Sequence, residues 1–179
     1  MESSKKIIVL TGMKHSGKST VGKILAGMLN MPFLDTDDVA AAMAGKPVRQ
    51  LYAEGGASLM QHWEAAACRE ACTRLETGGI LATGGGISDN SEALALVQAA
   101  GILVFLDTPL ELVYKRVLHS AERDGVMPAF LQGDDPAGKF AELFSRRTEI
   151  YARMAQIRIA TAGLSPKQVA TTLAGSVQT

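Results

Sequence analysis

Short apolar and β-branched runs alternate along the chain with longer stretches in which apolar residues recur at helical spacing. Such runs predict strands at residues 7–11, 32–34, 80–83, 102–106 and 157–160. The stretches between them predict helices at 18–29, 38–43, 57–77, 91–99, 109–119, 138–155 and 166–175. This alternation is typical of an α/β fold with a parallel sheet, because parallel strands need crossover connections that are usually helical.

The segment 122–138 interrupts the alternation. It contains Gly125, Pro128, Gly133, Pro136 and Gly138. Glycine and proline at this density favour irregular backbone, and we predict a mobile flap rather than a boundary between domains. The chain of 179 residues shows no internal repeat and no linker, so we expect residues 1–179 to form a single domain.

The charge balance argues against several classes of partner. Lysine plus arginine and aspartate plus glutamate number 18 each, so no net charge attracts nucleic acid or an anionic membrane. No apolar stretch has the length of a membrane-spanning helix, and the first residues lack a signal-peptide pattern, so we expect a cytoplasmic protein. Cys68 and Cys72 are expected to be reduced structural thiols, because the further ligands of a metal site are missing.

A phosphate-binding motif follows the first predicted strand directly. The segment from Gly12 to Thr20 reads GMKHSGKST, which fits the pattern GxxxxGKS between a strand and a helix. In this motif backbone amides face phosphate oxygens, the lysine reaches the terminal phosphates and the serine hydroxyl can ligate Mg²⁺. The N-terminus of the next helix adds to the attraction. We therefore predict that ATP or GTP binds at Gly12, Ser16, Gly17, Lys18, Ser19 and Thr20.

Two further clusters follow the second and third strands, at the edge where α/β sheets bind their ligands. After the second strand, Asp35 is suited to hold Mg²⁺ through water and Asp37 to bind a substrate hydroxyl. Capping of the next helix is the alternative interpretation of these aspartates. After the third strand, Gly84, Gly85 and Gly86 indicate close approach to a ligand, with a simple turn as the alternative.

Taken together, these motifs resemble the shikimate kinase family of small phosphate-loop metabolite kinases. The likeness spans almost the whole chain and rests on GMKHSGKST, FLDTD at 33–37, ATGGG at 82–86, VFLDTPLE at 104–111 and RRTEIYARMA, which holds Arg147 and Tyr151. The resemblance implies a three-layer fold with a five-stranded parallel sheet in the order 2-3-1-4-5. It also implies a substrate-binding helical region at about 36–65, a lid at about 122–138, and a monomer.

The resemblance implies transfer of the γ-phosphoryl group of ATP, with Mg²⁺, to a hydroxyl of shikimate in aromatic amino acid biosynthesis. Lys18 would then hold the β and γ phosphates, Ser19 and Asp35 would serve Mg²⁺, and Asp37 would orient the accepting hydroxyl. The acceptor pocket would be lined by Gly84, Gly85 and Gly86. Arg147 would bind the substrate carboxylate and Arg116 would pack on adenine near Pro166, although Arg146 leaves open which arginine faces the substrate.

Several positions depart from the family pattern. The family motif of Phe-Arg followed two residues later by Glu reads Met60-Gln61-His62-Trp63-Glu64 here, so Gln61 stands at a carboxylate-binding arginine. The lid arginine is replaced by Met127, and a loop glycine is replaced by His15. A neutral amide cannot copy the charge-assisted bonds of an arginine fork.

Several interpretations stay open. Arg123 can substitute for the lid arginine with shikimate as acceptor, or Gln61 and Met127 mark a pocket for a less anionic polyol or sugar acid such as gluconate. A nucleotide-binding regulatory module is the third, but intact Lys18 and Asp37 argue against it. A nucleoside monophosphate kinase would need more basic residues for its acceptor. We predict an ATP-dependent kinase of a small hydroxylated metabolite, with shikimate as the leading candidate.

Overall fold

The computed structural model describes residues 7–128 and 131–177 of the chain, and two residues of the predicted lid, 129 and 130, lie outside these ranges. A five-stranded sheet forms the centre of the fold, in the order β2-β3-β1-β4-β5. Its strands are β1 (Ile7–Thr11), β2 (Phe33–Asp35), β3 (Gly79–Ala82), β4 (Gly101–Asp107) and β5 (Ile157–Ala160). All neighbouring strands pair in parallel. The predicted fold class and strand order are confirmed.

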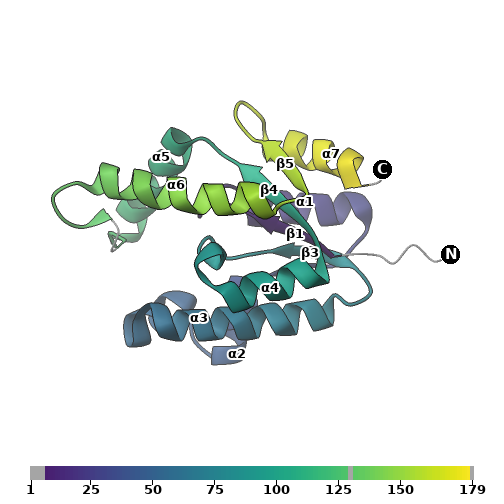
Figure 1. The fold of residues 1–179 in the computed structure, drawn as a ribbon, viewed down its shortest axis with the longest axis horizontal. Helices are drawn as coiled ribbons and strands as arrows, with labels where there is room; N and C mark the ends of the chain where they lie inside the picture. Colours follow the sequence, from purple (N-terminus) through teal and green to yellow (C-terminus); the bar gives the residue numbers. More distant parts are fainter. Residues whose placement is uncertain (1–6, 129–130, 178–179) are drawn as a thin grey trace.

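The buried positions of the strands alternate between two cores, one on each face of the sheet. Ile7 and Val9 of β1 belong to the core under the helices α2 (Thr36–Ala44), α3 (Val48–Arg74), α4 (Ser91–Ala100), α5 (Leu110–Asp124) and α6 (Pro136–Met154). Ile8 and Leu10 belong to the core under α1 (Lys18–Leu29) and α7 (Pro166–Val177). Figure 1 shows the resulting three layers, with the sheet between the two groups of helices. The alternation follows from the two-residue period of a strand.

The bounds of α3, and those of the two helices that flank the predicted lid, differ from the prediction in ways that affect the site. The helix α3 begins at Val48, nine residues before the predicted start, because Gly56 joins two helical pieces across a kink with φ 61° and ψ −154°. The helix α5 continues to Asp124 and ends at Gly125, which has φ 66° and caps the helix. Since α5 ends at Asp124 and α6 begins at Pro136, α-helix covers both ends of the predicted lid.

A short 3-10 helix, η1 (Ile87–Asp89), connects β3 with α4 and was not predicted. Asn90 follows it and accepts a hydrogen bond from the amide of Ala93, which caps α4. The carboxyl ends of β1, β2 and β3 thus lead into the phosphate loop, α2 and η1 at one edge of the sheet. None of the helices in the described ranges is long and apolar enough to cross a membrane.

Candidate active site

The phosphate loop takes a conformation that its sequence explains at two glycines and one histidine. Gly12 has φ 142°, and a Cβ atom there would lie 2.9 Å from the carbonyl oxygen of Leu106. Gly17, which precedes α1, has φ 98°. His15 also has a positive φ, 63°, which is uncommon for a residue with a side chain. The family pattern has a glycine at this position, and glycine adopts positive φ without steric cost. His15 takes the same left-handed conformation.

Lys18 is folded back onto this loop. Its ammonium donates to the carbonyl oxygens of Gly12 and Met13, at 2.9 and 2.7 Å. Burial lowers the pKa of Lys18 to about 8, against the opposing charges of Asp37 and Asp35. The loop therefore holds a buried cation that a bound phosphate would stabilise. Ser16 is buried as well, and its hydroxyl has no hydrogen-bond partner among the residues that the structure describes.

Ser19 and Asp35 connect the loop with the end of β2. The Ser19 hydroxyl donates to Oδ2 of Asp35 at 2.5 Å, while Oδ1 of Asp35 accepts from the amide of Asp37 at 3.0 Å and caps α2. The capping interpretation of Asp35 is therefore confirmed for one oxygen, while the other oxygen contacts the loop. A hydroxyl and a carboxylate in contact, close to a phosphate site, are ligands that suit Mg²⁺, which keeps several waters and phosphate oxygens.

Asp37 lies at the boundary between this cluster and an acceptor-sized cavity. The protein around its carboxyl displaces solvent and raises its pKa above the usual value, and the charge of Asp35 acts in the same direction. Its side chain nevertheless remains open to the cavity, which it lines. A carboxylate with this environment can accept a hydrogen bond and a proton from an alcohol.

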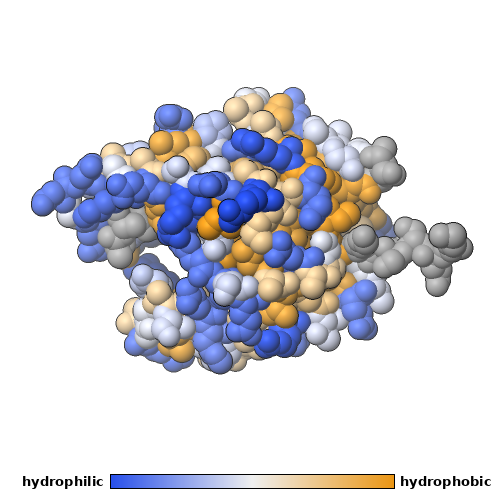
Figure 2. Space-filling model, viewed as in Figure 1, coloured by the Kyte–Doolittle hydropathy of each residue, from blue (hydrophilic) through white to orange (hydrophobic). Residues whose placement is uncertain are grey.

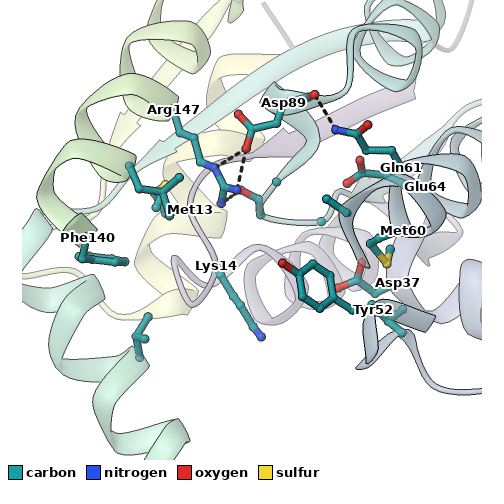
Figure 3. A pocket seen from close by; sticks show the side chains of 17 residues that line it. Met13, Lys14, Asp37, Tyr52, Met60, Gln61, Glu64, Asp89, Phe140 and Arg147 are labelled. Carbon is teal, nitrogen blue, oxygen red and sulfur yellow. Dashed lines mark hydrogen bonds and ion pairs between the residues drawn. The ribbon is translucent and has the colours of Figure 1, made fainter. Parts of the chain in front are cut away.

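The cavity has a volume of about 290 Å³ and lies between α3 and α6. Figure 2 shows this face of the molecule hollowed between the two helices, with hydrophilic residues around the opening. Figure 3 shows the lining side chains, which come from the phosphate loop, α2, α3, η1, α5 and α6. The polar or charged lining residues are Lys14, Asp37, Tyr52, Gln61, Glu64, Asp89 and Arg147.

The glycines after β3 form one wall of the cavity. A Cβ atom on Gly85 would lie 2.5 Å from the backbone nitrogen of Lys14, so this segment touches the phosphate loop itself. A Cβ on Gly84 would lie 3.0 Å from Oδ1 of Asp37, and one on Gly86 would lie 3.4 Å from Nη2 of Arg147. All three glycines line this cavity. These glycines are explained by their close approach to Lys14, Asp37 and Arg147, which belong to the protein itself.

Arg147, rather than Arg146, lines the cavity. Its Nε and Nη2 donate to Oδ2 of Asp89 at 3.0 and 2.7 Å, and its Nη1 donates to the carbonyl of Gly85 at 3.2 Å. Arg146 binds the other oxygen of Asp89 from the exposed side, at 2.5 Å. Burial would raise the pKa of Asp89, but the bond from Arg146 and the charge of Arg147 outweigh it and lower that pKa.

Gln61 lies in the cavity wall but turns to the backbone. Its Nε2 donates to the carbonyl oxygen of Asp89 at 3.1 Å, as Figure 3 shows. The Asn90 amide returns two bonds to α3, to the Gln61 carbonyl at 2.9 Å and to Glu64 Oε2 at 3.0 Å. Glu64 is 7% exposed, and burial raises its pKa.

The second cavity, of about 550 Å³, lies on the other side of the phosphate loop. It is lined by Gly17 and Thr20 of the predicted nucleotide site, by Arg116 and Pro166, and by Arg123. Arg116 donates to the carbonyl oxygen of His15 at 2.9 Å. The structure therefore brings Arg116 and Pro166 together beside the loop.

Arg123 lies on this nucleotide side and pairs with Asp124 at 2.9 Å. Met127 is 45% exposed and is absent from the residues that line the acceptor cavity in the described part of the chain.

The sequence interpretation missed Asp89, Asn90 and Tyr52. Asp89 and Asn90 come three and four residues after Gly86, and a polar pair so close to a glycine-rich strand exit is a signal that could have identified them. Tyr52 lies in the part of α3 that precedes the Gly56 kink, which was not predicted as helix.

Comparison with known proteins agrees with this geometry. The family model described as shikimate kinase matches residues 14–178. The chain belongs to the shikimate kinase family. A shikimate kinase of Persephonella marina is 34% identical over 171 residues, which cover 96% of this chain and 98% of that protein.

Solved shikimate kinases share the fold. The enzyme of Acinetobacter baumannii in complex with shikimate superposes with a TM-score of 0.85 at 28% identity, covering 98% of this chain and 94% of that one. The enzyme of Aquifex aeolicus gives a TM-score of 0.76 at 27% identity, covering 96% and 95%. In the acceptor cavity, Gln61 is the residue that departs from the arginine of the family pattern.

Proposed function

We propose that this chain transfers the γ-phosphoryl group of ATP to a hydroxyl of a small metabolite held in the cavity between α3 and α6. The observation that carries the proposal is the contact between the two halves of the site. Ser19 of the phosphate loop bonds to Asp35, and Asp37 two residues later lines the acceptor cavity. Donor and acceptor sites on either side of one loop are what in-line phosphoryl transfer requires.

In this proposal Lys18 and the loop amides hold the terminal phosphates, and Thr20, Arg116 and Pro166 border the rest of the nucleotide. Ser19 and Asp35 hold Mg²⁺, which neutralises phosphate charge when bound. Asp37 accepts a hydrogen bond from the acceptor hydroxyl and takes its proton. The acceptor oxygen forms a bond to the γ-phosphorus as the bond to the β–γ bridging oxygen breaks, and ADP leaves with that electron pair.

Shikimate is the first acceptor to test, because the relatives that match over most of the chain are shikimate kinases and one neighbouring structure contains shikimate. A specific observation favours a second candidate, a kinase of an uncharged polyol. Arg147 is the one arginine that lines the cavity in the described part of the chain, and a carboxylate of the protein already binds it.

The test is a coupled assay for ADP formation with shikimate, quinate, gluconate, uncharged polyols and nucleoside monophosphates. We expect turnover that requires Mg²⁺ and one of the hydroxylated metabolites. Asp37→Asn should lower kcat at least a hundredfold, because the base is lost while the shape is kept. Asp38→Asn is the matched control, since Asp38 is exposed, next in sequence, and outside the cavity lining. ATP binding without turnover of any acceptor would favour a regulatory nucleotide-binding module instead.

We further propose that the chain works as a single-domain monomer in the cytoplasm and that the segment around 125–135 closes over bound substrates. Residues of α5 and α6 line the cavity, and this segment joins the two helices, which supports a closing role. Size-exclusion chromatography with light scattering tests the monomer. Amide exchange of the segment should slow when nucleotide and acceptor are both bound, and unchanged exchange would contradict closure.

A further inference from the structure

Lys14 belongs to the phosphate loop, but it lines the acceptor cavity between α3 and α6. Among the lining residues that the structure describes, Lys14 and Arg147 are the two cations. Arg147 donates to Asp89 and to the carbonyl of Gly85. Lys14 is exposed, and within the described ranges its ammonium has no hydrogen bond or ion pair with another residue. The charge of Lys14 is therefore available to a ligand of the cavity.

The backbone of Lys14 is fixed, although its side chain is free. A Cβ atom on Gly85 would lie 2.8 Å from the Cα of Lys14, so the segment after β3 packs directly against this residue. The carbonyl of Met13, the preceding residue, accepts from the Lys18 ammonium at 2.7 Å. The carbonyl of His15, the following residue, accepts from an arginine of α5 at 2.9 Å. Binding an anion would therefore order the side chain of Lys14 but not the loop, which lowers the entropic cost.

The charge of Lys14 acts on groups at both sides of the proposed transfer. Burial and the charge of Asp35 raise the pKa of Asp37, and the charges of Lys18 and Lys14 oppose that rise. Burial lowers the pKa of Lys18, and Lys14 adds to the lowering. In Figure 3 the ammonium of Lys14 extends away from Arg147, so the two cations face different parts of the cavity. Lys14 is thus the cation of the acceptor cavity that lies toward the phosphate loop.

The proposed reaction carries negative charge through this region. A phosphoryl group in transit spreads its charge over its equatorial oxygens, and catalysis depends mainly on fixed positive charge around it. Lys18 supplies such charge from the donor side. On the acceptor side, the cavity presents the carboxyl groups of Asp37, Glu64 and Asp89, which repel a phosphate. A cation at the entrance from the loop would offset this repulsion.

We propose that Lys14 is a catalytic residue that contacts the phosphoryl group from the acceptor side during transfer and binds the phosphate of the product afterwards. This inference rests on the proposed kinase function, for which it adds a second cation besides Lys18. In the step, the acceptor oxygen bonds to the γ-phosphorus, the bond to the bridging oxygen breaks with its electron pair going to ADP, and the hydroxyl proton goes to Asp37. Lys14 stays charged throughout and exchanges no proton.

The first test measures the transfer step itself. A single-turnover experiment with protein in excess over ATP, at saturating shikimate and Mg²⁺, follows the chemistry without product release. Lys14→Met removes the charge and keeps a flexible side chain, and it should lower the rate constant by about tenfold or more. Lys14→Arg restores the charge and should recover most of the rate. Thermal unfolding of both variants should match the native protein, because the side chain is exposed.

The second test measures binding and does not depend on turnover. Calorimetry gives the Kd of shikimate and of shikimate 3-phosphate, each in the presence of Mg²⁺ and ADP. Lys14→Met should bind the phosphate ester more weakly than the native protein by about tenfold or more, while its affinity for shikimate stays within about twofold. Both ligands carry the same ring and carboxylate, so the difference isolates the phosphate.

Lys23→Met is the matched control for both tests. Lys23 is an exposed lysine on α1 and is absent from the lining of both cavities in the described part of the chain. Its substitution removes the same charge and should leave the rate constant and both Kd values within about twofold of the native values.

Three results would overturn the proposal. Equal losses of affinity for shikimate and for its phosphate ester would show that Lys14 binds the acceptor carboxylate instead. An unchanged affinity of Lys14→Met for the ester, including the case in which neither protein binds it, would show that Lys14 is a solvated surface lysine. An unchanged single-turnover rate would show that Lys14 makes no contact during transfer. Failure of the kinase function is a different observation, since the native protein itself would then form no ADP with any acceptor.

Discussion

The hydroxyl of Ser19 donates to Oδ2 of Asp35 at 2.5 Å, which joins the first turn of α1 to the end of β2. These two residues lie 16 positions apart in sequence, and both belong to the site proposed for Mg²⁺. Because Asp35 caps α2 with its other oxygen, the metal site and the start of the helix that carries Asp37 are one unit. A change at Asp35 that keeps the cap should therefore separate the metal function from the structural one.

Asp35→Asn provides this separation, because asparagine caps helices as well as aspartate does. We expect the Mg²⁺ concentration for half-maximal activity to rise at least tenfold, since a neutral amide is a weaker ligand for a hard cation. Thermal stability should change little. The measurement is a Mg²⁺ titration of the coupled assay together with binding of ATP in the presence of a chelator.

The chelator experiment is the internal control for this variant, because metal-free nucleotide binding should stay within about threefold of the native value. Asp38→Asn again serves as the control, because it removes one negative charge from a nearby residue outside the proposed metal site. An unaltered Mg²⁺ requirement in Asp35→Asn would remove Asp35 from the proposed metal site.

Much of this site could be predicted from the sequence because its chemistry depends on local patterns. The strands and helices around the phosphate loop show the sequence periods that follow from backbone geometry. Lys18 and Ser19 lie in the loop and helix that follow β1, and Asp35 ends β2, where α/β sheets bind their ligands. The glycines after β3 were predicted to allow close approach, and Gly85 touches the backbone of Lys14. Where the local backbone requires a particular residue type, that requirement can be recognised in a short segment of sequence.

What could not be predicted depends on contacts between distant segments. Arg147 was expected to bind a substrate carboxylate, but its partner Asp89 lies 58 positions away and reaches it through a 3-10 turn that has no periodicity to detect. The helix predicted at 57–77 begins at Val48 instead, because the chain is helical on both sides of Gly56, a single residue with positive φ. Local propensity identifies a break at Gly56, but it does not show that a helix also precedes the break.

Gly85→Ala should destabilise the protein and impair the site. A Cβ atom at this position would lie 2.5 Å from the nitrogen and 2.8 Å from the Cα of Lys14, and backbone atoms cannot move away as a flexible side chain can. We expect a loss of about 1–3 kcal/mol in the free energy of unfolding, typical of overpacking. The measurement is denaturant unfolding with and without ATP, and ATP should stabilise the variant less than the native protein.

Gly27→Ala is the matched control for that substitution. Gly27 lies inside α1, and a Cβ there would meet nothing within 4 Å. Alanine should therefore raise the free energy of unfolding by about 0.5–1 kcal/mol, through its better helix propensity. If both glycine variants changed stability in the same direction, contact with Lys14 would not be the reason for Gly85.

ATP binding should take up protons near pH 8. Burial lowers the pKa of Lys18 to about 8 in the free protein, so about half of the molecules carry a neutral amine at that pH. Phosphate oxygens favour the charged form, and Lys18 should therefore gain about half a proton on binding at pH 8. Calorimetry in two buffers with different ionisation enthalpies measures this number.

Lys18→Met should abolish the proton uptake and weaken ATP binding, while Lys23→Met, an exposed lysine on the same helix, should preserve both. ATP affinity of the native protein should fall as the pH rises above 8. Binding without proton exchange at pH 8 would contradict a buried, partly neutral Lys18.

Glu64→Gln should make stability less sensitive to pH. Glu64 is buried in the cavity wall, where burial raises its pKa above that of an unfolded chain. The unfolded state therefore loses this proton at lower pH than the folded state, and the carboxyl's contribution to stability falls as the pH rises from about 4. Glutamine cannot ionise, yet its oxygen can still accept the bond from Asn90.

The free energy of unfolding of Glu64→Gln, minus that of the native protein, should thus increase between pH 4 and pH 7 in denaturant titrations. Glu70→Gln, an exposed glutamate on α3, should show a difference that stays flat, and a flat or falling difference for Glu64→Gln would show that the buried carboxyl does not oppose folding at neutral pH.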